Sequence, residues 1–411
     1  MEVHVKQLVP VYEFDRLAAN WIMKFVGNPR IALRLWDGHE FYFADGAPVG
    51  VLEFLNRSAL LDLLFFQSVG FGEGYSKGKI RIHGNLLDLL NEAAGAVTGS
   101  GYGSYYFDRF RSLLRAIRGN TLARSRDNVH HHYDLGNDFY EMWLDERMVY
   151  TCAYYDNTEA TLAEAQFAKL DHVCRKLDLK PGQQVIEAGC GWGALAMHMA
   201  EHYGVKVKAY NNSHEQVAYA RKKAAARGLD DRVEFVEDDY RTISDECDVF
   251  VSIGMLEHVG RRNYHALGRL IDRCLKRNGV GLIHSIGRSH PRPVDPWITK
   301  RIFPGGYVPS LGEITSIFEP HRFSVVDVEN LRLHYARTCR DWLQNFEKVS
   351  DQVADMYNEE FMRAWRLYLA GSSAAFQSGT LQLYQVLFAP HGNNDVPWSR
   401  RYQYAPDTTK G

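Results

Sequence analysis

The chain has 411 residues, of which 45% are hydrophobic and 24% are charged, and its formal net charge is −2. This length allows two or three domains, and the composition is typical of a globular protein. The near-neutral charge argues against a nucleic-acid binder, and no apolar run approaches the roughly 18 residues that cross a bilayer. The cysteines include no Cys-x-x-Cys pair, and the N-terminus lacks the apolar region of a signal peptide. We therefore expect a cytoplasmic protein without a disulfide framework.

Residues 1–118 are expected to form a small α+β domain of their own. The sequence predicts an apolar helix at 55–66, a glycine-rich turn at 70–75, a short strand at 80–82 and a helix at 85–94. None of these segments carries a catalytic pattern, so the expected role is packing or holding of a substrate. A linker rich in Gly, Ser and Tyr follows at 95–106.

The segment 107–118 has a helical pattern with one basic face. Arg111, Arg115 and Arg118 fall on the side opposite Phe110. A basic amphipathic helix can lie on an anionic membrane surface, but a solvated helix packed on a domain has the same pattern. The sequence leaves both interpretations open.

Three successive histidines follow at positions 130, 131 and 132. Adjacent side chains diverge, and no Cys or His partner lies at the spacing of a metal site. We expect packing or hydrogen-bonding roles for these histidines and predict no bound metal.

A buried strand, a glycine-spaced turn and a helix are predicted in succession at 184–200. The turn comprises Gly189, Cys190, Gly191, Trp192 and Gly193, and Glu187 precedes it. Such a turn brings backbone N–H groups and a helix N-terminus up to a ligand, and a β-carbon on its glycines would block close approach. The Gly-x-Gly-x-Gly spacing after an acid resembles motif I of the S-adenosylmethionine-dependent methyltransferases. A glycine turn without a ligand is the open alternative.

The remaining chain alternates strands and helices, as a doubly wound α/β sheet requires. Strands are predicted at 205–210, 233–236, 247–253, 280–285, 323–328 and 381–388, and helices at 214–227 and 264–275. The last two strands are expected to form an antiparallel pair at one edge. Insertions at 288–312 and 338–376 follow late strands and are expected to roof the carboxyl edge of the sheet, where ligands bind. The expected catalytic domain spans 119–411.

Two segments carry a more specific resemblance. His132-Tyr-Asp-Leu-Gly-Asn-Asp-Phe-Tyr140 and Tyr150-Thr-Cys-Ala-Tyr154 resemble the signature that precedes the core of cyclopropane-fatty-acyl-phospholipid synthases and their mycolic-acid relatives. The second segment has Thr151 where the family has Ser, and the resemblance extends from about residue 128 to residue 390. It implies a class I methyltransferase fold with a seven-stranded sheet and helical lid insertions, and S-adenosylmethionine as the cofactor.

The resemblance also implies which residues bind the cofactor, in addition to the glycine turn and Glu187. They are Tyr150, Thr151, Asn211, Asn212, Gln216, Asp239, Tyr240 and Arg241. The first two would touch the methionine end, and the last three would flank the adenine. The three amides follow the second strand, where a nucleotide-binding sheet commonly offers an acid to the ribose, and an amide oxygen can also accept from a hydroxyl. Turn formation alone is the alternative for each of these residues.

In this family the sulfonium methyl adds to a cis double bond, and proton loss from the new methyl closes a cyclopropane ring. Members hold a bicarbonate ion as the base, and its ligands correspond here to Cys152, Glu257, His284, Ile286 and Tyr335. A His, a Tyr hydroxyl and backbone N–H groups can hold an oxyanion, while Glu257 can accept the bicarbonate proton. Cys152 as a nucleophile with His284 as its base is the rival interpretation, but alkene methylation needs no covalent enzyme intermediate.

The resemblance thus implies an enzyme that visits the inner face of the membrane and acts on unsaturated phospholipid acyl chains, and it is compatible with a homodimer. Tyr307 stands where the family commonly has Cys, which leaves chain and double-bond specificity open. Two alternatives remain. Proton loss from a neighbouring carbon would give a methylene-branched chain, and a vestigial site would make the protein an inactive lipid-binding homologue.

Overall fold

The computed structural model describes residues 10–99 and 135–404, and the chain divides into two compact units. The first unit contains residues 1–109, 295–302 and 339–380, and the second contains 110–294, 303–338 and 381–411. Two segments that the sequence assigns to the catalytic domain therefore belong to the first unit. The predicted boundary at 118 lies outside the described residues and stays a prediction, as does the roofing role of the two insertions.

The first unit is built on a four-stranded sheet with the order β2-β1-β3-β4. Its strands are β1 (Ile31–Arg34), β2 (Glu40–Phe41), β3 (Gly50–Phe54) and β4 (Ile80–Gly84). Its helices are α1 (Glu13–Val26), α2 (Arg57–Phe66), α3 (Ser68–Ser76), α4 (Leu86–Gly99), α13 (Pro296–Arg301), α16 (Ser350–Met356) and α17 (Glu359–Gln377). Helix α17 packs on α3 and α4. The predicted helices at 55–66 and 85–94 and the strand at 80–82 are confirmed as α2, α4 and β4.

The prediction of a glycine-rich turn at 70–75 is wrong, because these residues lie in helix α3. A β-carbon at Gly70 would collide with the backbone of Asp62 in α2, and one at Gly72 would collide with the Trp297 ring of α13. The glycines therefore permit close packing between helices rather than a chain reversal. The predicted linker at 95–106 also begins too early, because α4 continues to Gly99.

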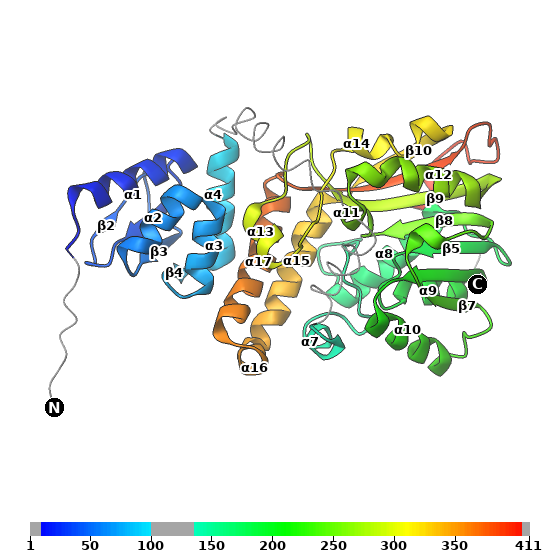
Figure 1. Ribbon diagram of the computed structural model, residues 1–411, viewed down its shortest axis with the longest axis horizontal. Helices are drawn as coiled ribbons and strands as arrows, with labels where there is room; N and C mark the ends of the chain where they lie inside the picture. The colour runs from blue at the N-terminus through cyan, green and yellow to red at the C-terminus, as the bar shows by residue number, and fades with distance from the viewer. Residues whose placement is uncertain (1–9, 100–134, 405–411) are drawn as a thin grey trace. The chain divides into compact units, whose positions relative to one another are not determined.

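The second unit is a doubly wound α/β domain with a seven-stranded sheet, whose strands lie side by side in the order β10-β11-β9-β8-β5-β6-β7 (Figure 1). The strands are β5 (Gln184–Ala188), β6 (Lys206–Asn211), β7 (Val233–Glu237), β8 (Cys247–Ile253), β9 (Leu275–Gly287), β10 (Phe323–Asn330) and β11 (Gln382–Pro390). Strand β11 runs antiparallel to both of its neighbours, and the other pairs are parallel. This is the predicted class I methyltransferase sheet with its antiparallel pair at one edge.

Helices cover both faces of this sheet. They are α7 (Asn137–Glu141), α8 (Leu162–Lys176), α9 (Ala194–Tyr203), α10 (His214–Ala226), α11 (Leu256–Val259), α12 (Tyr264–Cys274) and α14 (Leu311–Thr315), while α15 (Arg332–Lys348) begins in this unit and ends in the first. Among residues 10–99 and 135–404, every helix is too short or too polar to span a lipid bilayer.

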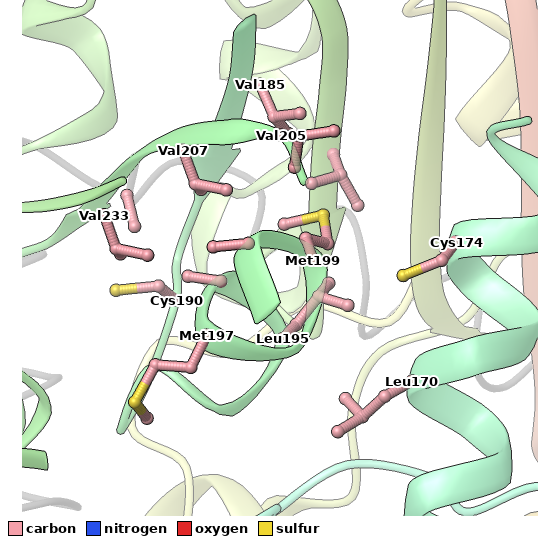
Figure 2. Close-up of a cluster of buried hydrophobic side chains, with 14 of the residues drawn as sticks. Leu170, Cys174, Val185, Cys190, Leu195, Met197, Met199, Val205, Val207 and Val233 are labelled. Carbon is pink, nitrogen blue, oxygen red and sulfur yellow. The ribbon is translucent and has the colours of Figure 1, made fainter. Parts of the chain in front are cut away.

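Two hydrophobic cores sandwich the sheet, because successive strand residues point to opposite faces. Val185 of β5, Val207 of β6 and Val251 of β8 pack against α8, α9 and α10. Figure 2 shows part of this cluster, with Leu170 and Cys174 contributed by α8. Ile186 and Ala188 face the other core, which α11, α12 and α14 cover. Burial on both faces makes the strands of this sheet a rigid base for the side chains at their carboxyl ends.

Candidate active site

The glycine turn between β5 and α9 has two distinct requirements for glycine. Gly189, Gly191 and Gly193 have φ angles of 84°, 55° and 82°, a region that disfavours other residues. A β-carbon at Gly193 would lie 2.5 Å from the Phe235 ring, whereas one at Gly191 would meet nothing within 4 Å. Packing thus requires Gly193, while Gly191 borders open space in which a ligand can approach the backbone.

A polar network braces this turn from the end of β6. The N–H groups of Gly189 and Cys190 both donate to the Tyr210 carbonyl, at 2.9 and 3.1 Å. The Asn211 side-chain amide donates to the Gly191 carbonyl at 3.2 Å and to Gln216 Oε1 at 2.7 Å. Both amide residues are buried, whereas Asn212 is half-buried. Asn211 and Gln216 therefore support the turn, a role that the sequence did not reveal.

Glu187 in β5 places a carboxylate directly before this turn. The residue is 2% exposed, and its Oε2 has no hydrogen-bond partner among the described residues. Burial raises the pKa of Glu187 to about 8, against the opposing effect of the Lys169 ammonium. A buried carboxylate oxygen without a partner is costly unless a donor or a cation reaches it. The site therefore suits a ligand that carries a positively charged group.

Helix α8 holds the segment 149–155 against the sheet through two buried side chains. Gln166 Nε2 donates to the carbonyls of Val149 and Thr151, at 3.3 and 2.9 Å, and Lys169 Nζ donates to Thr151 Oγ1 at 3.0 Å. Burial lowers the pKa of Lys169 to about 8, while the neighbouring Cys152, acidic side chains and Cys174 oppose this shift. Sequence reasoning missed both residues. Two polar side chains three positions apart, among residues that form the buried face of a helix, were the available signal.

Aromatic rings cover the other side of the segment 149–155, which we call the motif segment. The Tyr150 ring lies 5.4 Å from both Tyr140 and Trp143, and Tyr140 lies 5.0 Å from Trp192 of the glycine turn. Trp192 Nε1 donates to Asn137 Oδ1 at 2.7 Å, so the turn is tied to α7. The signature run that includes α7 thus contributes an aromatic wall beside the glycine turn.

The end of the motif segment is locked to α15. The Tyr154 ring lies between His172 and His334, with centroids 4.2 and 4.8 Å apart and interplanar angles of 22° and 9°. The Ala153 N–H donates to Thr338 Oγ1 at 3.0 Å. Because Tyr335 lies on the same helix as His334 and Thr338, these contacts set its position relative to the motif.

Glu257 lies in α11, just beyond the end of β8. Its Oε1 accepts the Ile286 N–H at 2.6 Å, and its Oε2 is buried without a partner among the described residues. Burial of this carboxylate raises the pKa of Glu257 to about 7, although the bond from Ile286 opposes the shift. The Ile286 N–H therefore orients Glu257, and the role of Ile286 in holding an anion stays a prediction.

His284 lies two residues before Ile286 on β9 and is 2% exposed. Its Nδ1 is 3.2 Å from Gln385 Nε2 on the neighbouring β11, and its carbonyl accepts the Gly254 N–H at 2.9 Å. A β-carbon at Gly254 would lie 3.0 Å from Thr151 Cγ2, which places the motif segment beside this strand end. Burial lowers the pKa of His284 well below its usual value, so its imidazole is neutral. Gln385 was missed, although a glutamine within an apolar strand was a visible signal.

Cys152 and Tyr335 meet at the start of α15. The fully buried Cys152 thiol points at the carbonyl oxygens of Ala153 and Leu331, at 3.2 and 3.9 Å. The Tyr335 N–H donates to the same Leu331 carbonyl at 3.1 Å, and Tyr335 is 8% exposed. A thiol bonded to carbonyl groups fits a neutral neighbour of the site better than a nucleophile.

The segment predicted to flank an adenine is held by its own side chains. The Asp239 carboxylate accepts the Arg241 backbone N–H at 3.0 Å and its guanidinium at 2.8 and 3.1 Å. Tyr240 lies between them in sequence and is 9% exposed, and its hydroxyl has no partner among the described residues. Burial raises the pKa of Tyr240 to about 12.

The predicted residues thus gather at the carboxyl ends of five neighbouring strands. Those expected to bind the cofactor lie at or after the ends of β5, β6 and β7, except Tyr150 and Thr151 of the segment before α8. Those expected to be catalytic lie after β8, near the end of β9 or on segments packed there. No group of His, Cys, Asp and Glu suited to a metal ion occurs within the described part of the chain, and the three histidines at 130–132 and the basic segment 107–118 lie outside it.

A family model for mycolic acid cyclopropane synthetases matches residues 120–386. The cyclopropane-fatty-acyl-phospholipid synthase of Escherichia coli K12 is 38% identical over 81% of this chain and 86% of that protein. A probable fatty acid methyltransferase of Pseudomonas putida is 34% identical over 91% of this chain and 96% of that protein. The solved mycolic acid cyclopropane synthase CmaA1, in complex with SAH and CTAB, superposes with a TM-score of 0.61 at 32% identity, over 64% of this chain and 97% of that one. The chain belongs to the mycolic acid cyclopropane synthetase family and is a methyltransferase.

Proposed function

We propose that this methyltransferase uses S-adenosylmethionine to add one carbon to a cis double bond in a phospholipid acyl chain, which gives a cyclopropane ring. The observation that carries the proposal is the buried Glu257 carboxylate, oriented by the Ile286 N–H of strand β9, which also carries the neutral imidazole of His284. It occurs in a chain that is 38% identical to a protein named cyclopropane-fatty-acyl-phospholipid synthase.

The residues of the glycine turn fit the cofactor. S-adenosylmethionine, when bound, supplies an electrophilic methyl group on a positively charged sulfur. Glu187 offers a buried carboxylate oxygen to the cationic amino group of the cofactor, and Gly191 leaves room for its approach. Tyr150 and Thr151 line the methionine end, and Tyr240, steadied by its neighbours, lies at the adenine end. The mycolic acid cyclopropane synthase that matches this chain was solved with SAH, the demethylated form of this cofactor.

The residues expected to be catalytic, which include Glu257, His284 and Tyr335, fit an anionic base, for which we propose bicarbonate. Bicarbonate, when bound, supplies an oxygen that removes a proton from the methylated acyl chain. The Tyr335 hydroxyl and the ring of His284 are suited to donate hydrogen bonds to such an anion, and Glu257 Oε2 is suited to accept its hydroxyl proton. Burial of these groups also keeps water away from a developing carbocation.

A second candidate product follows from the same binding residues. Loss of a proton from a carbon next to the cation would give a methylene-branched acyl chain rather than a ring. The relative in Pseudomonas putida, named as a probable fatty acid methyltransferase, favours keeping this candidate. The position of the base relative to the cation decides between the two products. For either product the substrate lies in a bilayer, so we propose that the protein acts as a peripheral membrane enzyme.

Mass spectrometry of acyl chains tests this proposal. Purified protein is incubated with S-adenosylmethionine, bicarbonate and vesicles that contain cis-unsaturated phospholipid. A one-carbon gain that survives mild hydrogenation as a ring establishes cyclopropanation, whereas a gain that takes up hydrogen establishes the methylene product. The absence of any gain, with the cofactor still bound, would contradict the proposed acceptor.

Substitution of alanine at two glycines should separate folding from cofactor binding. Gly193→Ala places a β-carbon against Phe235 at a positive φ, so we expect a loss of several kcal/mol in the free energy of unfolding. Gly191→Ala meets no atom within 4 Å and should cost about 1 kcal/mol, but it should weaken cofactor binding at least about tenfold. Thermal unfolding and isothermal titration calorimetry measure the two effects. Unchanged affinity in Gly191→Ala would contradict the cofactor site.

The rate should rise with pH through about 7 at a fixed bicarbonate concentration. The pKa of Glu257 is raised to about 7, and the proposed role requires the ionised carboxylate, so kcat/KM should increase as the proton leaves. Stability should change in the opposite direction. The folded protein retains this proton where the unfolded chain releases it, so the free energy of unfolding falls as pH rises from about 4.5 to about 7. A flat rate profile over this range would contradict the role of Glu257.

A further inference from the structure

Helix α1 of the first unit carries two apolar faces. One face, with Ala18, Ala19, Ile22 and Met23, is buried in the core of the unit. Another face exposes large apolar side chains, with exposed fractions of 55% for Phe14, 66% for Leu17, 54% for Trp21 and 50% for Phe25. These four residues, which we call the α1 apolar strip, are not needed for the packing of the unit itself. Exposed apolar surface of this kind marks an interaction site.

The α1 apolar strip is continuous along the helix. Its residues are three or four positions apart, a spacing that places them on one side of an α-helix. The rings of Trp21 and Phe25 are stacked, with centroids 5.5 Å apart and planes at 13°. Aromatic side chains, and Trp above all, favour the boundary between lipid headgroups and acyl chains.

The charges around the strip suit an anionic partner. Lys24 is exposed on α1 and has no ion-pair partner among the described residues, whereas Arg16 lies on the side of the helix away from the strip. Asp15, in contrast, is buried and pairs with Arg57 at 2.8 Å, which neutralises it. Glu13 is the remaining exposed acid and lies at the N-terminal end of the helix. Lys24 follows Trp21 by three positions and borders the strip, as basic residues do in helices that lie on membranes.

The size of the strip argues against a second copy of the chain as its occupant. Four large side chains of about 150–250 Å² each, exposed by half to two thirds, present roughly 400–500 Å². A stable protein interface buries about 800 Å² on each partner. A helix that lies in a membrane surface needs only one apolar side and flanking cations.

We propose that the α1 apolar strip docks the protein on an anionic phospholipid bilayer, with Lys24 next to the lipid phosphates. The strip would enter the boundary between headgroups and acyl chains and would not span the bilayer. This docking role is separate from the methyl-transfer chemistry, although a substrate in the bilayer gives it a purpose.

Vesicle flotation of the full-length protein tests the docking surface. Vesicles of phosphatidylglycerol and phosphatidylethanolamine should carry the wild-type protein, and the double variant Leu17→Ser/Trp21→Ser should bind at least about tenfold more weakly. Trp398→Ser is the matched control, because Trp398 is fully exposed in the other unit, and it should bind as the wild type does. Lys24→Gln should bind more weakly to the anionic vesicles and show a smaller dependence on salt.

Unchanged flotation of the Leu17→Ser/Trp21→Ser variant, with an unchanged melting temperature, would overturn the proposal. Sedimentation that shows a loss of self-association in this variant, with vesicle binding intact, would overturn it in favour of a second copy. The assay contains no cofactor, so its result is independent of catalysis. On detergent-dispersed lipid the variant should retain the turnover of the wild type. Absence of turnover in both proteins would contradict the proposed function and leave the flotation result unaffected.

Discussion

Glu257→Gln is expected to lower the turnover number at least about a hundredfold and to leave cofactor affinity within about twofold of the wild type. The amide keeps an oxygen that can accept the Ile286 N–H, so the local geometry is retained. Its NH2 group replaces the second oxygen, which has no partner among the described residues, and this group cannot accept a proton from a bound anion. Single-turnover measurement of acyl-chain methylation and calorimetry of cofactor binding check the two parts.

Asp171→Asn is a suitable control for this variant. Asp171 also carries a carboxylate in the second unit, but its partners include the Tyr203 hydroxyl at 2.6 Å and the Arg175 guanidinium at 3.1 Å, away from the carboxyl ends of the strands. This variant should lose some stability and retain its turnover number. A turnover number for Glu257→Gln equal to that of the control would remove Glu257 from the catalytic group.

Lys169→Met is expected to reduce both stability and cofactor affinity. The buried ammonium holds the Thr151 hydroxyl and lies in the field of the Glu187 carboxylate, so its removal leaves a buried acid without a compensating charge. Loss of one member of a buried charge pair typically costs about 3–5 kcal/mol. We expect a loss near the lower end, because Glu187 can take up a proton, and a weakening of cofactor binding by at least about tenfold.

A second lysine on the same helix provides a matched control. Lys176 is equally buried, but its partner is Glu329 at 2.6 Å, on β10. Lys176→Met should lose comparable stability and keep its affinity for the cofactor. The double variant Lys169→Met/Glu187→Gln should regain part of the stability, because neither buried charge remains. Full cofactor affinity in Lys169→Met would show that the lysine supports only the fold.

Local patterns predicted much of the second unit. The bounds of β8 match the prediction, and the strand, glycine turn and helix at 184–200 appear as expected, because hydrophobic period and glycine spacing are local properties. The turn at 70–75 failed for a nonlocal reason. Its glycines are used for contact with α2 and α13, and the latter lies more than two hundred residues away in the chain.

The same limit applies to the candidate site. Glu257 and His284 could be proposed from a resemblance to a family, but the partners of Lys169 and Gln385 became visible only when separate elements were brought together. Gln385 contacts a histidine 101 residues earlier, across two antiparallel strands. Supporting roles of Asn211 and Ile286 became visible for a similar reason, because the protein itself uses their hydrogen-bonding groups.

The first unit is discontinuous in sequence, and this has a consequence for synthesis on the ribosome. Helix α17, which packs on α3 and α4, is completed roughly 280 residues after α4 ends. At about 5–20 residues per second, this delay lasts about 15 to 55 s. During that time the nascent chain displays the apolar sides of α3 and α4 without their final partner, so it should depend on chaperones that bind such surfaces. Products of premature termination before residue 359 would never bury these sides, which makes them substrates for proteolytic quality control.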